Sequence, residues 1–349
     1  MVIKCSSGDG KDAVVKVTAS IYVCADHRDQ AKAMLQAAVD EVKFTLMGSV
    51  SPPPTPEPVP APTETPSPIP TSTATDKWQI KKLYADALGD RAQTWTMDMS
   101  NPSSDPRFKN EQNANLRKEA DGGWSSDGSE NGKFQVRLEG WSESGSKKWL
   151  NTEITVYAQF MQDIATGDPG AYAFQLYRGG GHHSSKSPCD GAAYKARIRK
   201  DKSVVICKEV LHPDYTNNKG GLRKLTKDPK GNYIGVKEVV YNLPKAASGR
   251  TPVKIEVWVD EEGMNPQGVL DPVKQNWILA AETIDNGGWA SGDGGGCPAI
   301  EIGNTGKRKP DEILNTSGGT SEGNLCAYRT DGVKSKIKYF SIREIKPPI

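Results

Sequence analysis

The sequence predicts a mostly β protein whose main domain is a two-sheet jelly-roll sandwich, and three observations support this fold class. Only 36% of the 349 residues are hydrophobic, while the chain contains 35 Gly and 24 Pro, a composition that suits short strands joined by many turns. After residue 76, short alternating segments follow one another without helical periodicity between them. Many strands without intervening helices predict two packed sheets, and roughly 270 residues is the size class of a jelly roll.

Residues 1–50 are predicted to form a small α/β module of unknown role. The segment 13–24 alternates and carries β-branched residues, which indicates a strand, while apolar residues in 26–44 recur at helical spacing. One strand and one helix are too little to fold robustly alone. We therefore expect a disulfide between Cys5 and Cys24, or docking onto a partner chain.

Residues 51–75 are predicted to be a spacer. They contain ten prolines among Thr, Ser and Glu, which favours extended polyproline II and cannot pack a core. Such linkers are typical of secreted modular proteins, so we expect an extracellular or surface-exposed location. The first twenty residues lack the apolar core of a signal peptide, and no apolar run is long enough to span a bilayer.

Residues 76–349 are predicted to form the β-jelly-roll domain, with carbohydrate-directed activity argued below. Alternation with period two marks the strands, and Gly, Pro and Asp clusters mark the turns between them. The expected strands are 134–138, 153–160, 171–178, 194–199, 204–210, 236–242, 253–260, 277–284 and 337–345.

Histidine and basic residues concentrate in the stretch 171–230. Three of the four histidines, His182, His183 and His212, lie there, together with thirteen Lys and Arg against five Asp and Glu, although the whole chain carries a net charge of only +2. Arg, His, Tyr and Lys are the side chains that bind a carboxylate and move a proton near neutral pH. The stretch therefore indicates an anionic ligand.

The six cysteines favour disulfides over a metal site. No pair has the Cys-x-x-Cys spacing of a zinc ribbon, and an oxidising compartment favours disulfides. Spacing alone does not give their connectivity.

Two strands carry side chains of interest on one face. Lys195, Arg197 and Arg199 share a face of one strand, and Lys208 on the next strand is expected to join them. Trp258 lies between two carboxylates on the non-core face of 253–260. We expect it to be either a platform on which a sugar stacks or a Trp half covered by a loop. We expect one concave sheet to carry Arg178, Lys195, Lys208 and Trp258.

The order of several short motifs along residues 76–349 resembles a little-characterised group of secreted proteins with a concanavalin A-like jelly roll, related in style to polysaccharide lyases. The resemblance implies the fold, and it implies disulfides 189–297 and 207–326. The motifs are Arg178-Gly-Gly-Gly-His182, Cys189-Asp-Gly-Ala-Ala-Tyr194-Lys195, Lys208-Glu209-x-x-His212, Glu256-Val-Trp258-Val-Asp260-Glu, Gly287-Gly-Trp289 followed by Cys297, and Ser341-Ile-Arg-Glu-Ile345.

The residues favour β-elimination over glycoside hydrolysis. Concanavalin-like hydrolases carry Glu-x-Asp on one strand, whereas here Trp258 stands in the middle place of the match between Glu256 and Asp260. Elimination on a uronate polymer needs a cation to neutralise the sugar carboxylate, a base and an acid. We assign these roles to Arg178, His182 and Tyr194 respectively. The expected substrate-binding residues are Gln175, Lys195, Arg197, Lys208, His212 and Trp258.

Three alternatives remain beside the lyase prediction. The protein could be a non-catalytic carbohydrate-binding or adhesion module of a cell or virion surface. A metal site built from His182, His183, Cys189 and His212 would need a reduced Cys189, against the secreted setting. Asp285, Asn286 and Asp293 are weak calcium candidates that match no defined calcium loop; no other cofactor is expected. Nucleic-acid binding is not expected, because the basic stretch contains no recognised module.

Overall fold

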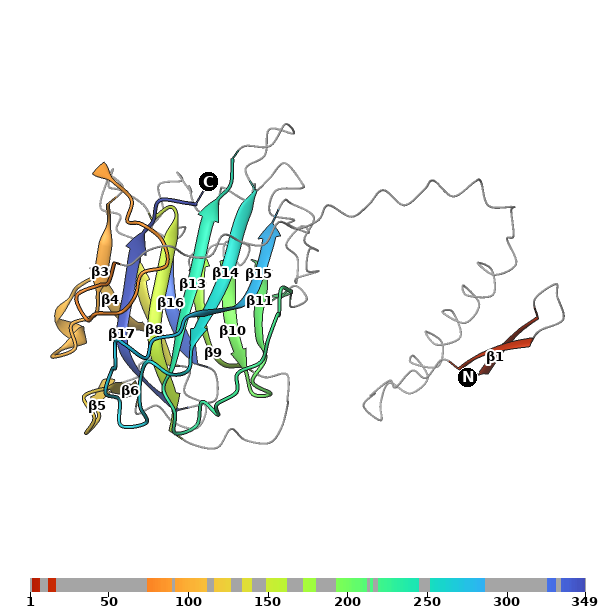
Figure 1. The fold of residues 1–349 in the computed structure, drawn as a ribbon, viewed down its shortest axis with the longest axis horizontal. Coiled ribbons are helices and arrows are strands. Elements are labelled where there is room, and N and C mark those ends of the chain that lie inside the picture. The colour runs from red at the N-terminus through yellow and green to blue at the C-terminus, as the bar shows by residue number, and fades with distance from the viewer. Residues whose placement is uncertain are drawn as a thin grey trace. The chain divides into compact units, whose positions relative to one another are not determined.

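In the computed structural model the chain divides into two compact units, Met1–Ser67 and Pro68–Ile349 (Figure 1). The structure describes residues 2–6, 12–16, 74–89, 92–111, 116–126, 134–139, 149–161, 172–179, 193–211, 214–215, 219–244, 252–285, 325–330 and 334–348. No helix among them is long and apolar enough to cross a membrane.

In the first unit, β1 (Val2–Ser6) pairs antiparallel with β2 (Asp12–Lys16), and Cys5 lies opposite Ala13. The predicted strand 13–24 therefore begins as a strand. Cys24 and the predicted helix 26–44 lie outside the described residues.

The second unit contains two antiparallel sheets packed face to face, which confirms the predicted mostly β sandwich of jelly-roll type (Figure 1). The strands of the seven-stranded sheet are, in spatial order, β12 (Asp214–Tyr215), β11 (Val204–Leu211), β10 (Ala193–Arg199), β9 (Tyr172–Gly179), β16 (Leu325–Thr330), β7 (Phe134–Glu139) and β4 (Phe108–Glu111).

The eight-stranded sheet forms the other layer. Its strands are, in spatial order, β15 (Ile278–Asp285), β14 (Val253–Asp260), β13 (Ile234–Asn242), β8 (Thr152–Phe160), β17 (Ser335–Glu344), β6 (Trp124–Ser126) and β5 (Leu116–Lys118), with β3 (Thr94–Thr96) also paired to β17. A short 3-10 turn, η3 (Pro102–Ser104), precedes β4.

The core lies between the two sheets, because alternate residues of each strand point toward the opposite layer. Aromatic rings fill much of it: Phe160 and Phe174 pack edge to face at 5.6 Å between ring centroids, and Trp95 packs against Phe340 at 5.3 Å. Burying each such side chain contributes about 1.5–3 kcal/mol, so this layer supplies most of the driving force for folding.

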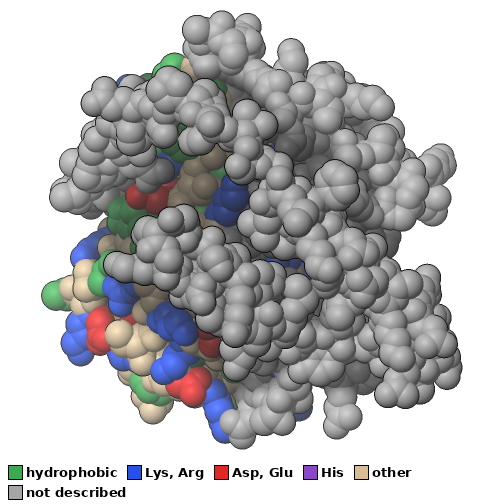
Figure 2. Space-filling view, turned by 90° about the vertical axis from the view of Figure 1, so that its right-hand side faces the viewer, with side chains coloured by type: hydrophobic (Ala, Val, Ile, Leu, Met, Phe, Trp, Pro, Cys, Tyr) green, Lys and Arg blue, Asp and Glu red, His purple; other side chains and the backbone are tan. Residues whose placement is uncertain are grey.

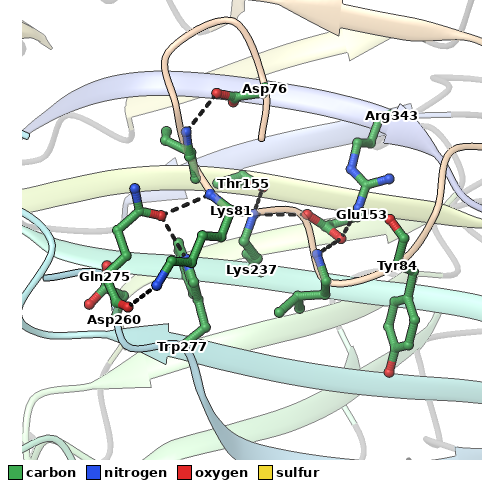
Figure 3. Close-up of polar contacts among 12 residues, drawn as sticks. Asp76, Lys81, Tyr84, Glu153, Thr155, Lys237, Asp260, Gln275, Trp277 and Arg343 are labelled. Atoms are coloured by element: carbon green, nitrogen blue, oxygen red, sulfur yellow. Dashed lines mark hydrogen bonds and ion pairs between the residues drawn. The ribbon is translucent and has the colours of Figure 1, made fainter. Parts of the chain in front are cut away.

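A second apolar layer covers the outer face of the eight-stranded sheet. Residues 74–88, which we call the strap, cross this face (Figure 3). Leu83 and Tyr84 of the strap pack on Val239 and Trp258 of the sheet. Trp258 is therefore only 6% exposed, which explains why β13 and β14 are buried on both faces.

The strap also covers an ion network. Lys237 Nζ lies 2.8 Å from Glu153 Oε1 and 2.8 Å from Thr155 Oγ1, and Arg343 donates to the other oxygen of Glu153 (Figure 3). The backbone N–H of Leu83 donates to the same carboxylate at 3.2 Å. The charges are thus paired where the strap excludes water.

Candidate functional site

A row of long polar side chains crosses the outer face of the seven-stranded sheet, which faces away from the core. Arg197 of β10, Gln175 of β9 and Arg329 of β16 are register partners on three neighbouring strands. Lys195 lies two residues before Arg197 and therefore on the same face. We call these four residues the basic face.

Strand alternation fixes the direction of the basic face. The residues next to them in sequence, such as Leu176, Ala196 and Tyr328, point the other way and belong to the core between the sheets. Arg197 Nε donates to Gln175 Oε1 at 3.2 Å, which orients both side chains. No side chain of the basic face is more than 3% exposed.

The basic face combines three cationic side chains with one amide. Two guanidinium groups flank one amide, each one strand away and therefore about 4.8 Å along the hydrogen-bonding direction. Lys195 adds a third cation. Guanidinium, amide and ammonium groups in such a row are the kind of groups that bind a carboxylate or another anion.

Three predicted site residues, Arg178, Tyr194 and Lys208, point the other way, into the space between the sheets. They are register neighbours on β9, β10 and β11. The Tyr194 hydroxyl donates to Asp285 Oδ2 at 2.8 Å, and Lys208 Nζ lies 2.6 Å from the same oxygen. An Arg178 terminal nitrogen donates to the carbonyl of Trp149 at 2.5 Å. All three side chains are fully buried.

The expected grouping of Arg178, Lys195, Lys208 and Trp258 on one concave sheet is therefore wrong. Tyr194 and Lys195 are consecutive and must face opposite sides of β10, and Lys208 faces the same side as its partner Tyr194. Trp258 belongs to β14 of the other sheet. The structure brings together Gln175, Lys195 and Arg197 of the predicted set.

Arg329 belongs to the basic face and was not among the sequence-predicted residues. It lies in β16, a strand that the alternation did not mark. The segment Leu325–Thr330 does alternate, with Cys326 and Tyr328 in the core, so a search for short strands would have found it.

The remaining predicted residues of this region, His182, His183, His212, Asn286 and Asp293, lie outside the described residues, as do Cys189 and Cys297. Asp285 is only 1% exposed and is engaged by Tyr194 and Lys208. Within the described ranges, no group of three or more His, Cys, Asp or Glu residues is placed to hold a metal ion.

The disulfide between Cys207 and Cys326 is a wrong prediction, since the structure forms no such bond. Cys326 lies opposite Arg178 and Cys207 opposite Lys195, so β9 and β10 separate the two cysteines. Three strand spacings amount to about 14 Å, whereas a disulfide needs Cα atoms within about 7 Å. Burial raises the pKa of the Cys326 thiol to about 12, which keeps it protonated and unreactive.

Glu256 and Asp260, the two carboxylates that match the hydrolase motif, both accept hydrogen bonds from buried side chains. Glu256 accepts hydrogen bonds from Tyr84, Tyr241 and Trp258 at 2.7, 2.9 and 2.9 Å under the strap. Asp260 accepts from the Tyr157 hydroxyl at 2.6 Å. Both carboxylates are fully buried and stabilise the outer layer of the eight-stranded sheet, so Trp258 stands on a packed surface rather than on an open platform.

Part of the basic stretch is paired with acids at the surface. Lys224 lies 3.0 Å from Asp201, Lys227 lies 2.9 Å from Glu262, and Arg223 lies 3.1 Å from Glu261. Figure 2 shows Lys and Arg side chains interspersed with Asp and Glu on the described part of one side of the molecule. Clustering in the sequence therefore overstates the positive charge of this surface.

No protein-family model and no curated protein sequence matches this chain. Comparison with solved structures finds a peanut lectin with a bound 9mer peptide, at 11% identity and a TM-score of 0.35, covering 73% of this chain and 100% of the lectin. It also finds the exoplasmic/lumenal domain of VIP36 in a Ca²⁺-bound form, at 7% identity and a TM-score of 0.39, covering 75% of this chain and 95% of that domain. A third similar structure is a putative glycosyl hydrolase from Parabacteroides distasonis, at 9% identity and a TM-score of 0.33, covering 69% of this chain and 79% of the hydrolase.

Proposed function

We propose that this protein is an extracellular or surface-exposed carbohydrate-active protein that binds an anionic, uronate-containing polysaccharide at the basic face and cleaves it by β-elimination. One observation carries the proposal: Arg197, Gln175 and Arg329 form a row across three strands beside Lys195. The Pro/Thr spacer supports the location.

The row suits a sugar carboxylate chemically. A guanidinium group binds a carboxylate through two parallel hydrogen bonds, and a neighbouring amide adds a neutral donor. The four side chains are at most 3% exposed, so the proposal requires this face to open to the polymer; a charge–charge contact made there is stronger than at an open surface. We therefore transfer the carboxylate-neutralising role from Arg178, which lies inside the sandwich, to Arg197 and Arg329.

Neutralising the carboxylate prepares the elimination. It acidifies the adjacent C–H, a base removes that proton, and the electron pair forms a C=C bond as the glycosidic C–O bond breaks. The leaving oxygen takes up a proton, and the products are one chain with a new reducing end and one with an unsaturated uronate. His182 remains our proposed base and His212 a proposed substrate contact. The Tyr194 hydroxyl donates its hydrogen bond to Asp285 between the sheets, so we do not propose Tyr194 as the acid.

The test is absorbance near the unsaturated-uronate band after the full chain is incubated with alginate, glucuronan, pectate and glycosaminoglycans. We expect product from at least one polymer, and at least a tenfold lower rate for Arg329→Gln. Lys224→Ala is the matched control, because it removes a cation that is 63% exposed and paired with Asp201. Thermal melting of each variant separates lost activity from lost folding.

Three outcomes decide between the candidate functions. Polymer binding without product, weakened by Arg329→Gln, would establish the binding-module alternative. Neither binding nor product on any polymer would reject the proposal. Unchanged activity in a folded Arg329→Gln variant would remove the basic face from the mechanism.

A further inference from the structure

We propose that Trp78 and Tyr339 form a second glycan-binding site, in which the two rings stack against a pyranose ring of a neutral polysaccharide. This site lies on the outer face of the eight-stranded sheet, on the opposite side of the sandwich from the basic face. Its ring centroids are 5.3 Å apart and the rings are tilted by 45°. The proposal does not depend on the activity proposed for the basic face.

The first step of the argument is the turn that carries Trp78. Asp76 Oδ1 accepts the backbone N–H groups of Trp78 and Ile80 at 2.8 and 2.9 Å, and the Asp76 N–H donates to the Ile80 carbonyl at 2.9 Å. Gln79 completes the turn in the left-handed region, at φ 67°. Trp78 therefore sits in a closed turn with its backbone fixed.

The second step is the anchor of this turn on the sheet. The amide of Gln275, which is 4% exposed, donates to the Gln79 carbonyl at 2.8 Å and accepts the Lys81 N–H at 2.8 Å. Lys81 Nζ donates to the Gln275 carbonyl at 2.8 Å (Figure 3). One buried side chain thus holds the C-terminal end of the turn on the sheet, which preorganises the Trp78 ring before any ligand arrives.

The third step is the backbone of Tyr339. Its φ is 55°, and it lies where the register of β17 shifts between Lys338 and Ser341. Of the three non-glycine residues with positive φ among the described residues, Gln79 and Tyr339 are two. Backbone strain of this kind persists where the surroundings enforce it and concentrates at functional sites, and bulges redirect side chains next to such sites.

The fourth step is the exposure of the rings. They pack on Ile80, Tyr157, Tyr233 and Met264, none of which is more than 3% exposed, yet they are themselves only partly buried. The exposed side chain of Lys77 places Nζ 4.6 Å from the Trp78 ring centroid. This face of the indole therefore lies on the solvent side of the cluster under the Lys77 ammonium group, which a sugar ring would have to displace.

The size and chemistry of the surface indicate the class of ligand. A full aromatic side chain offers about 150–250 Å², so two partly buried rings fall well short of the roughly 800 Å² per partner of a stable protein interface. Aromatic rings bordered by hydrogen-bonding groups, here the exposed Lys77 and Gln79, fit the apolar C–H face and the hydroxyls of a sugar.

The experiment is affinity electrophoresis and calorimetry of the full chain with soluble mixed-linkage β-glucan, xyloglucan and galactomannan. We expect at least one to bind, with a tenfold or greater loss of affinity for Trp78→Ala and for Tyr339→Gly. Glycine accepts a positive φ, so the second variant removes a ring without straining the fold. Gln275→Leu, which keeps both rings but releases the turn, should weaken binding less than Trp78→Ala.

Lys195→Met separates this site from the basic face and should leave neutral-glycan affinity unchanged. Failure of uronate binding with intact neutral binding would refute only the proposed function. Absence of neutral-glycan binding by the wild type, or equal affinity of wild type and both ring variants, would overturn the present inference. So would tighter binding at these rings of a synthetic peptide with the Pro-rich sequence of residues 51–70.

Discussion

At the scale of single residues, direction within a strand decides role. Tyr194 and Lys195 are neighbours in sequence, yet one donates to Asp285 between the sheets and the other belongs to the basic face. Sequence alternation could not settle which side was inward, because β10 is buried on both faces. Lys195 and Arg197 were correctly placed on one face by their spacing, whereas Arg178 and Lys208 were grouped with them by their charge.

The pairing of Lys237 with Glu153 predicts a large cost for removing one partner. Lys237→Met should lower the free energy of unfolding by about 3–5 kcal/mol, because it leaves a buried carboxylate with less compensation. Lys274→Ala is the control, since its pair with Asp271 is largely exposed and should contribute about 1 kcal/mol or less. Urea unfolding measures both; equal losses would mean that the network is not buried in solution.

The same network predicts acid sensitivity. Burial raises the pKa of Glu153, but Lys237 and Arg343 outweigh burial and hold this pKa below its usual value. A carboxyl whose pKa is depressed in the folded state stabilises the protein above its unfolded pKa of about 4.3, and that contribution is lost as pH falls further. We expect the stability difference between wild type and Glu153→Gln to shrink when unfolding is measured at pH 3 instead of pH 7.

For Glu238 we expect the opposite dependence of folding stability on pH. It faces the core, accepts the Ala196 N–H at 3.2 Å, and burial raises its pKa well above the usual value. A raised carboxyl pKa costs stability once pH exceeds the unfolded pKa. Glu238→Gln should therefore stabilise the protein relative to wild type at pH 7 and have little effect at pH 3. Destabilisation at pH 7 would show that the ionised form is needed.

At the scale of elements, length separates the predicted strands from the missed ones, except for the six-residue β16, which was missed. Each of the nine expected strands corresponds to an observed one of six or more residues, from β7 to β17. The strands β3, β5 and β6 have three residues each and β4 has four, too few for alternation to be distinguished from loop sequence. The strap has no periodicity of its own, because its backbone follows the turn around Asp76 and packs irregularly on the sheet.

The strap predicts where the domain can be shortened. A variant that begins at residue 74 should unfold at nearly the temperature of the full chain. Removal of residues up to 88 should destabilise the domain strongly, because Trp258 and the Glu153 network lose their cover. Thermal melting by circular dichroism compares the two variants; similar melting temperatures would show that the strap contributes nothing.

At the scale of the whole molecule, the sandwich separates two kinds of outer surface. One sheet carries the basic face, and the other carries the strap with its aromatic and ionic layer. If a polyanion binds at the basic face, its affinity should fall as salt rises, since ions screen each contact. We expect Lys195→Met to reduce both the affinity at low salt and the slope of log affinity against log salt, measured by calorimetry; an unchanged slope would exclude Lys195 from the contact.

The position of the strap has a practical consequence. Since residues 74–88 lie on the outer face of the eight-stranded sheet, whatever is joined ahead of residue 74 leaves the domain from the side away from the basic face. A biotin tag placed there would fix the molecule to a sensor chip through the outer face of the eight-stranded sheet, with the seven-stranded sheet on the far side from the chip. The same arrangement allows the domain to be displayed on a bead or scaffold without changing the seven-stranded sheet.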